Sequence, residues 1–259
     1  MITWARYPYE NTVVLVTGAG SGIGQATARA FLENGASVCV VGRREEPLRQ
    51  TVEGFPVERV LVCAGDVADR AQVEEVVLAT VERFGRLDVV VSNAGVFEGG
   101  EIDDYDDLAW ERMRGTNLDA LLYLARAVMP WLKRSRGNLV AISSVSGLRG
   151  DWGQFAYNAT KGAVNAMVQS LALDAGAQGV RANVIAPAFT ATRLTEKRLE
   201  DPGFAAALAD RVALGRAATP EDVARAVLFL AGPDASYITG ALIPVDGGTT
   251  ASTGQPRPL

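Results

Sequence analysis

Histidine is absent from this chain of 259 residues, and cysteine occurs only twice. The first absence excludes a histidine-based catalytic triad and most zinc sites, so we expect no bound metal, and proton transfer must use another side chain. Cys39 and Cys63 each lie in an apolar run, which favours reduced, buried thiols over a disulfide framework. No apolar run reaches membrane-spanning length and the start of the chain lacks a signal-peptide core, so we expect a cytoplasmic protein.

Charge of either sign is also modest. The net charge of −5 opposes a nucleic-acid surface, and we expect neither a nucleic-acid nor a membrane partner. No linker rich in proline, glycine or serine divides the chain, and its 48% hydrophobic content is ordinary for a protein with a large core. The composition therefore predicts a single domain over residues 1–259.

Apolar runs alternate with helical patterns along the chain, which predicts an α/β fold: a doubly wound, parallel, Rossmann-type sheet with helices on both faces. Two segments depart from the alternation. Residues 188–214 are too long for a simple connector and are expected to form a lid over a site, and residues 249–259 are expected to be poorly ordered. The seven expected strands cover 12–17, 36–41, 57–62, 87–91, 138–143, 181–185 and 241–245.

A hydroxyl, a phenol and an ammonium are grouped in the middle of the chain. Tyr157 and Lys161 are four residues apart, so on a helix they project from one face about one turn apart. A phenol has a pKa of about 10, and a nearby cation favours the phenolate, so we expect Lys161 to bring proton exchange closer to neutral pH. Ser144 follows a predicted strand and offers a hydroxyl to a substrate oxygen. Such a Tyr/Lys pair also arises by chance on amphipathic helices.

A glycine-rich turn follows the first predicted strand. Glycines permit a tight turn and close backbone approach, so a diphosphate fits against the free N–H groups of the next helix. The spacing of Gly18, Gly22 and Gly24 differs from the Gly-x-Gly-x-x-Gly of other dinucleotide folds. A glycine turn with no ligand is the alternative. The predicted contacts are Gly18, Ser21, Gly22, Ile23 and Gly24.

The second predicted strand ends without an acid. Sites that take NAD usually place a carboxylate there for the ribose hydroxyl, whereas this chain has Arg43 and Arg44, which can accept a 2′-phosphate. We therefore expect NADP(H), with NAD(H) possible. The alternative is that both arginines are solvated charges at a helix start.

Together with Asn93-Ala94-Gly95 and Asn117, these motifs closely resemble the short-chain dehydrogenase/reductase family, in its short, single-domain, 3-oxoacyl-carrier-protein-reductase-like branch. The resemblance covers nearly the whole chain. It implies that Asn117 holds a water linking the lysine to solvent, and that relatives are mostly tetramers, so a homotetramer is expected. The implied catalytic set is Ser144, Tyr157, Lys161 and Asn117.

The resemblance also implies further cofactor contacts. A structural role remains open for Asp66, as a helix cap, and for Asn93. Relatives commonly have Pro-Gly after the sixth strand, where this chain has Pro187-Ala188, and Thr190 puts an extra hydroxyl near the nicotinamide. The implied contacts are Asp66, Val67, Asn93, Ala94, Gly95, Tyr157, Lys161, Pro187, Thr190 and Thr192.

The activity implied is hydride transfer between NAD(P)(H) and a small-molecule carbonyl or secondary alcohol, with Tyr157 as general acid/base. One alternative is a catalytically silent nucleotide-binding sensor or scaffold with the same fold. Another is an enzyme that catalyses dehydration or isomerisation. The pocket wall is expected to be mostly apolar, as suits many ketones and alcohols. It comprises Val96, Phe97, Val145, Ser146, Trp152, Gln154, Phe189 and the lid.

Overall fold

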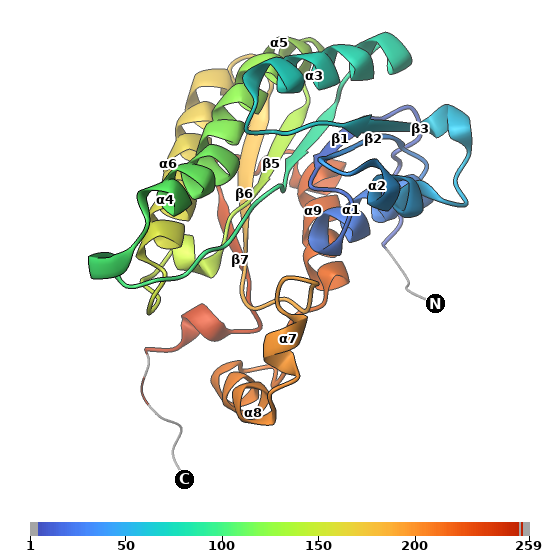
Figure 1. Cartoon of the computed structure of the whole chain (residues 1–259). Helices are drawn as coiled ribbons and strands as arrows, with labels where there is room; N and C mark the ends of the chain where they lie inside the picture. Colours follow the sequence, from blue (N-terminus) through green and yellow to red (C-terminus); the bar gives the residue numbers. More distant parts are fainter. Residues whose placement is uncertain (1–4, 254, 256–259) are drawn as a thin grey trace.

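Figure 1 shows the computed structural model, in which one twisted sheet carries helices on both faces. The structure describes residues 5–253 and 255. All seven strands are parallel, in the order β3-β2-β1-β4-β5-β6-β7, so the predicted doubly wound sheet is confirmed. The strands are β1 (Val13–Thr17), β2 (Ser37–Gly42), β3 (Val60–Ala64), β4 (Val89–Ser92), β5 (Asn138–Ile142), β6 (Arg181–Pro187) and β7 (Leu242–Val245).

Two hydrophobic clusters lie on opposite faces of the sheet. Every residue of β1 is buried, as expected for a central parallel strand. Successive residues, such as Val14 and Leu15, point to opposite faces and belong to different clusters. On one face pack α1 (Gly22–Glu33) and α9 (Pro220–Ala231). On the other pack α3 (Arg70–Phe84), α5 (Ala120–Ser135) and α6 (Phe155–Gly176).

One expected strand begins later than predicted. The third strand was expected from 57, but Val57–Arg59 is a 3-10 helix and β3 starts at Val60. The Arg59 guanidinium donates to the carbonyls of Leu32 and Ala36, which anchors this turn beside α1. Between β4 and β5 lie α4 (Asp107–Arg114), a π-helical turn at Gly115–Asp119 and α5.

The lid, residues 188–214, contains α7 (Glu196–Leu199) and α8 (Pro202–Arg211), which stand apart from the two helix layers in Figure 1. The expectation of a poorly ordered tail needs correction at its start, because Thr249–Ala251 forms a 3-10 helix. Residues 254 and 256–259 of that tail lie outside the described residues. Among the described residues, no helix combines the length and apolar character that crossing a membrane requires.

The strand order reverses between β1 and β4, which are neighbours in the sheet. Ligands of open α/β sheets bind at such a switch point, outside the carboxyl ends of the strands. The glycine turn follows β1, Asn93 follows β4 and Ser144 lies just beyond β5. The topology therefore collects the predicted site residues at one edge of the sheet.

Candidate active site

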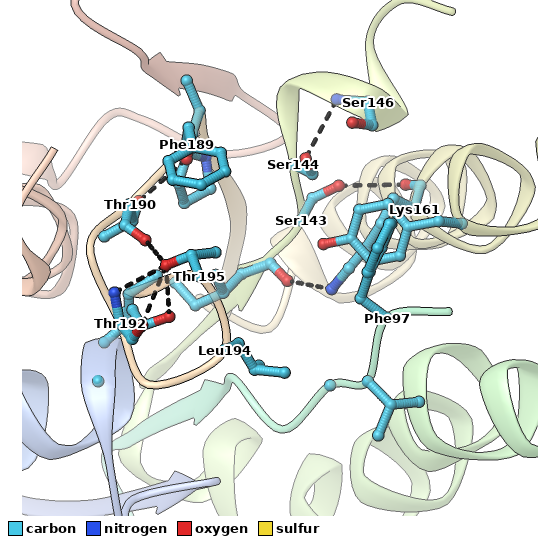
Figure 2. A pocket seen from close by; sticks show the side chains of 18 of the residues that line it. Phe97, Ser143, Ser144, Ser146, Lys161, Phe189, Thr190, Thr192, Leu194 and Thr195 are labelled. Atoms are coloured by element: carbon cyan, nitrogen blue, oxygen red, sulfur yellow. Dashed lines mark hydrogen bonds between the residues drawn. The ribbon is translucent and has the colours of Figure 1, made fainter. Parts of the chain in front are cut away.

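A cleft of about 1270 Å³ opens at this edge, between the strand ends and the lid. All of the predicted pocket-wall residues line it, and so do all but two of the predicted catalytic and cofactor residues. The exceptions are Gly24 and Asn117. Figure 2 shows Ser143, Ser144 and Lys161 on one side of this space and Thr190, Thr192 and Thr195 of the lid on the other.

The end of β5 and the first two turns of α6 bring the three predicted catalytic groups together. Lys161 Nζ lies 5.7 Å from the centre of the Tyr157 ring, so the two side chains share one helix face as their spacing predicts. Ser144 Oγ accepts from the Ser146 N–H at 3.1 Å, and its hydroxyl lies close enough to the Tyr157 phenol to lower the pKa of that phenol. A substrate oxygen placed between these hydroxyls would meet two donors.

Side-chain hydrogen bonds from both segments tie the Ser144 loop to α6. Asn158 Nδ2 donates to the Arg149 carbonyl at 2.7 Å, and Asn165 Nδ2 donates to the Gly147 carbonyl at 2.9 Å. The hydroxyl of Ser143 donates to the Lys161 carbonyl at 3.1 Å. These bonds fix the serine relative to the tyrosine. A sequence pattern cannot indicate them, because each acceptor is a backbone carbonyl.

Lys161 is buried, with 4% of its surface exposed. Its Nζ donates a hydrogen bond to the Ile142 carbonyl at 2.9 Å. Burial disfavours the charged form and lowers the pKa of Lys161 to about 8. The ammonium is therefore still cationic at neutral pH.

The pKa of Tyr157 corrects one expectation. Burial of the phenol raises its pKa above the ordinary value, and the Ser144 hydroxyl only partly opposes this shift. The predicted lowering is absent because Lys161 Nζ bonds to Ile142 and lies over the ring. Phe97 packs edge-on against the Tyr157 ring, with centroids 5.3 Å apart, and shields it further.

Asn117 lies in the π-helical turn and is buried. Its amide oxygen accepts from the Val96 N–H at 2.8 Å, and its Nδ2 donates to the Val96 carbonyl and to Thr160. A Cβ on Gly95 would lie 3.3 Å from Asn117 Oδ1 and 3.6 Å from Lys161 Nζ. Both side chains therefore approach the same side of Gly95, where a side chain would come between them, although Asn117 itself does not line the cleft.

Helix α1 begins without a cap, unlike several others. Ser21 makes no side-chain cap hydrogen bond and the first turn has no acid, whereas α3, α4, α8 and α9 start with an Asp or Thr side chain bonded to their N–H groups. The positive end of α1 therefore faces the cleft uncompensated, which fits a diphosphate. Gly22 lies at φ +54°, and a Cβ there would be 3.0 Å from Thr192 Cγ2, so a side chain would intrude on the cradle.

Gly24 is needed for packing, which corrects its predicted role as a cofactor contact. A Cβ there would lie 2.3 Å from the Gly18 carbonyl oxygen and 2.5 Å from Asn93 Nδ2. Asn93 in turn donates to the carbonyls of Thr17 and Gly18, so it steadies the turn between β1 and α1. Sequence reasoning missed Thr17, whose hydroxyl accepts from the N–H groups of Asn93 and Ala94.

The end of β2 presents positive charge to the cleft. Arg43 and Arg44 are exposed on its wall, and neither forms an ion pair with another described residue. Glu45, the first acid after the strand, pairs instead with Arg49 and does not line the cleft. Among the described residues, Asp66 is the one acid that lines the cleft near these arginines.

Asp66 and Val67 lie beyond β3, on the same wall as the arginines. The Asp66 carboxylate accepts from the Ala68 N–H, but the residue that caps α3 is Asp69, whose carboxylate accepts from Ala71 and Gln72. The alternative interpretation of Asp66 as the helix cap is therefore wrong.

A turn of three threonines follows β6. The Thr195 hydroxyl accepts from the Thr192 N–H at 2.9 Å and donates to the Thr190 carbonyl at 2.6 Å (Figure 2). The extra hydroxyl of Thr190 donates to the Ala188 carbonyl, so it is already engaged. Cleft-lining residues that sequence reasoning missed include Arg149, Asp151, Thr249, Thr250, Ser252 and Thr253.

Comparisons with known proteins agree with this geometry. A family model described as enoyl-(acyl carrier protein) reductase matches residues 18–250. The chain is 40% identical over 252 residues to meso-2,3-butanediol dehydrogenase of Serratia marcescens, covering 96% of this chain and 98% of that protein. It is 38% identical over 243 residues to the 3-oxoacyl-[acyl-carrier-protein] reductase FabG of Thermotoga maritima, covering 92% and 98%.

A solved short-chain dehydrogenase/reductase of Brucella melitensis superposes with a TM-score of 0.90 and 29% identity, covering 95% of this chain and 99% of that one. The family model spans most of this chain, and the butanediol dehydrogenase and the FabG reductase each align with this chain over nearly their full length. The chain therefore belongs to the short-chain dehydrogenase/reductase family and is an oxidoreductase that acts on alcohols or carbonyls.

Proposed function

We propose that this enzyme transfers a hydride between NADP(H) and a ketone or secondary alcohol, with Tyr157 as general acid and base. The observation that supports this most is the meeting of the Ser144 hydroxyl, the Tyr157 phenol and the Lys161 ammonium beside the uncapped end of α1. A nucleotide-binding scaffold has no use for a buried ammonium next to a buried phenol, since burying each group is costly.

The nicotinamide dinucleotide, when bound, supplies or accepts the hydride. Ser144 and Tyr157 donate hydrogen bonds to the substrate oxygen and orient its carbon. Because the pKa of Tyr157 is raised, the phenol keeps its proton at neutral pH, and this is the form that can protonate a carbonyl oxygen. Lys161, cationic below pH 8, stabilises the phenolate left behind. Lys161 then passes a proton to the phenolate, and a water held at Asn117, which Val96 positions, would return a proton to the lysine.

The residues around the cleft fit the dinucleotide in segments. The N-terminus of α1, with Gly18, Ser21, Gly22 and Ile23, would hold the diphosphate. Arg43 and Arg44 would hold a 2′-phosphate, which favours NADP(H) over NAD(H). Glu45, the first acid after β2, pairs with Arg49 instead. The remaining contacts would be Asp66 and Val67 to the adenine, Asn93, Ala94, Gly95, Tyr157 and Lys161 to the ribose, and Pro187, Thr190 and Thr192 to the nicotinamide.

A cytoplasmic homotetramer is part of the proposal. The helices near 105–133 and 153–177 are expected at its interfaces, and Leu108 and Leu173 on these helices are 61% and 84% exposed in the isolated chain. Both cysteines are free thiols, as suits a reducing compartment.

The test is Tyr157→Phe, assayed with NADPH and a carbonyl panel that includes acetoin and a 3-oxoacyl thioester. Loss of proton transfer should lower kcat by about 10²–10⁴-fold, while the Kd for NADPH, measured by its fluorescence, stays the same. Tyr237→Phe, at a fully exposed position outside the cleft, is the control and should behave as the unaltered enzyme does. An unchanged kcat in Tyr157→Phe would refute the proposed role.

A further inference from the structure

Positive charge is concentrated in the cleft of this acidic chain. The net charge is −5, yet the described residues lining the cleft include only two acids, Asp66 and Asp151. The Asp151 carboxylate already accepts from Gln154 Nε2 at 3.0 Å and from the Trp152 N–H. The lining bases are Arg43, Arg44, Arg149, Lys161, Arg193, Arg198 and Arg211.

Most of the basic residues of the lid and all of its acidic residues lie on different sides of it. Of its four basic residues, Arg193, Arg198 and Arg211 line the cleft and Lys197 does not. None of its four acidic residues lines the cleft; these are Glu196, Glu200, Asp201 and Asp210. A low-dielectric cleft lined by one sign of charge attracts ligands of the other sign.

The cofactor phosphates account for only part of this charge. Arg43 and Arg44 lie at the end of β2, and the diphosphate cradle is the start of α1, so neither requires the arginines on the lid helices. Arg198 forms no ion pair with another described residue. Its guanidinium instead stacks over the Phe204 ring, with Cζ 4.7 Å from the centroid. The charge is therefore held in place but not neutralised.

An apolar path connects Arg198 to the reacting groups. Phe204 packs against Phe189, with ring centroids 5.1 Å apart, and Phe189 faces Ser144 across the cleft in Figure 2. From the reacting groups outward, the cleft thus presents the hydroxyls of Ser144 and Tyr157, then the rings of Phe189 and Phe204, and then the Arg198 guanidinium. A molecule complementary to it has a carbonyl at one end, an apolar spacer and an anionic group at the other.

We propose that the substrate is such an oxo acid or the corresponding hydroxy acid, and that Arg198 determines this specificity by binding the anionic group. The proposal rests on the proposed function, because it assigns the opposite end of the molecule that Tyr157 acts on. A planar guanidinium matches a carboxylate through two parallel hydrogen bonds.

The probes are 3-oxobutanoate, 4-oxopentanoate and 5-oxohexanoate, each compared with its methyl ester. Binding is measured by calorimetry on enzyme saturated with the oxidised cofactor, which cannot reduce them, and turnover is measured separately with the reduced cofactor. At least one acid should bind roughly tenfold more tightly than its ester. Equal or weaker binding of the acid at all three lengths would overturn the proposal.

Arg198→Glu should remove or reverse the preference for the acid, and Arg198→Lys should keep part of it. Lys197→Glu makes the same change of charge on the neighbouring lid residue outside the cleft, and should leave the ratio of acid to ester affinity within twofold. If both glutamate variants shift the ratio equally, the effect is that of overall charge and the assignment to Arg198 fails.

Two further results distinguish this inference from the proposed catalytic role of Tyr157 and from a role of Arg198 in cofactor binding. Tyr157→Phe should abolish turnover of acid and ester alike while keeping the binding preference, so failure of the catalytic proposal shows in turnover alone. If Arg198→Glu instead weakens NADPH binding and leaves the acid-to-ester ratio intact, Arg198 serves a cofactor phosphate and the substrate assignment is wrong.

Discussion

The Lys161 ammonium and the Ile142 carbonyl form a buried hydrogen bond of 2.9 Å, which joins the second turn of α6 to the last residue of β5. Ser144 follows Ile142 by two residues, so the strand that holds the ammonium also presents the hydroxyl. The relative positions of the three proposed catalytic groups therefore depend on the packing of one helix against one strand.

Replacing this buried lysine should change how stability depends on pH. The folded pKa of Lys161 is about 8, against an ordinary 10.5, so between these values the unfolded chain binds more protons and the lysine's contribution to stability rises with pH. Lys161→Met should therefore be more stable than the unaltered protein at pH 7, by up to about 3 kcal/mol. Urea unfolding at pH 7 and pH 10 should show this advantage shrinking, and an equal advantage at both would contradict it. Lys133→Met, at an exposed position on α5, is the control.

Removing the arginine nearest the end of β2 should change cofactor selection. Arg43→Ala is expected to raise the KM for NADPH about tenfold, equivalent to about 1.4 kcal/mol, and to leave the KM for NADH within about twofold. Arg49→Ala removes an arginine that is paired with Glu45 away from the cleft, so it should leave both constants unchanged. Steady-state kinetics with both cofactors decides this, and an intact preference in Arg43→Ala would mean that other groups read the 2′-phosphate.

A methyl group at Gly24 should destabilise the turn between β1 and α1. Gly24→Ala would bring Cβ within 2.3 Å of the Gly18 carbonyl oxygen, which forces the backbone to shift and should cost roughly 1–3 kcal/mol. Gly176, the last residue of α6, has no atom within 4 Å of its would-be Cβ. Gly176→Ala should therefore be neutral or slightly stabilising. Thermal unfolding of the two variants gives the comparison, and similar midpoints would show that the turn adapts freely.

Asn117→Ala should be more damaging than the loss of one hydrogen bond. It leaves both the N–H and the carbonyl of Val96 without their partner, and such unsatisfied groups cost about 1–3 kcal/mol each. Thr160→Val removes the bonds that Thr160 Oγ1 makes with Asn117 Nδ2 and with the Tyr157 carbonyl, but it leaves both Val96 groups paired and should therefore cost less. Denaturant unfolding would order the two, and kcat should fall further in Asn117→Ala. Equal losses would indicate that the Val96 backbone finds other partners.

The sequence carried enough information to predict the sheet and the meeting of Ser144, Tyr157 and Lys161. Buried parallel strands appear as unbroken apolar runs, and a spacing of four places two side chains on one helix face. The exposure of an individual group has no such periodic signal. The raised pKa of Tyr157 depends on what covers the phenol, including Phe97, which lies sixty residues earlier in the chain.

Short elements were harder to predict for a similar reason. Val57–Arg59 resembles a strand start in composition, and its 3-10 turn depends on Arg59 reaching the carbonyls of Leu32 and Ala36. The position of Gly24 suggested a phosphate contact, whereas the close approach of Gly18 and Asn93 explains it. Both features depend on contacts between residues distant in the chain.

The threonine turn and the lid helices share no strand with the catalytic groups, whose mutual bonds stay within β5, the Ser144 loop and α6. In the proposed assignment, the proton-transfer groups and the anion-binding Arg198 therefore lie in separate segments of the chain. Exchange of residues 193–211 with the matching stretch of a relative should redirect which alcohols are accepted while the proton-transfer step is inherited unchanged. The same proton-transfer segments can therefore serve dehydrogenases that differ in the lid and in the alcohols they accept.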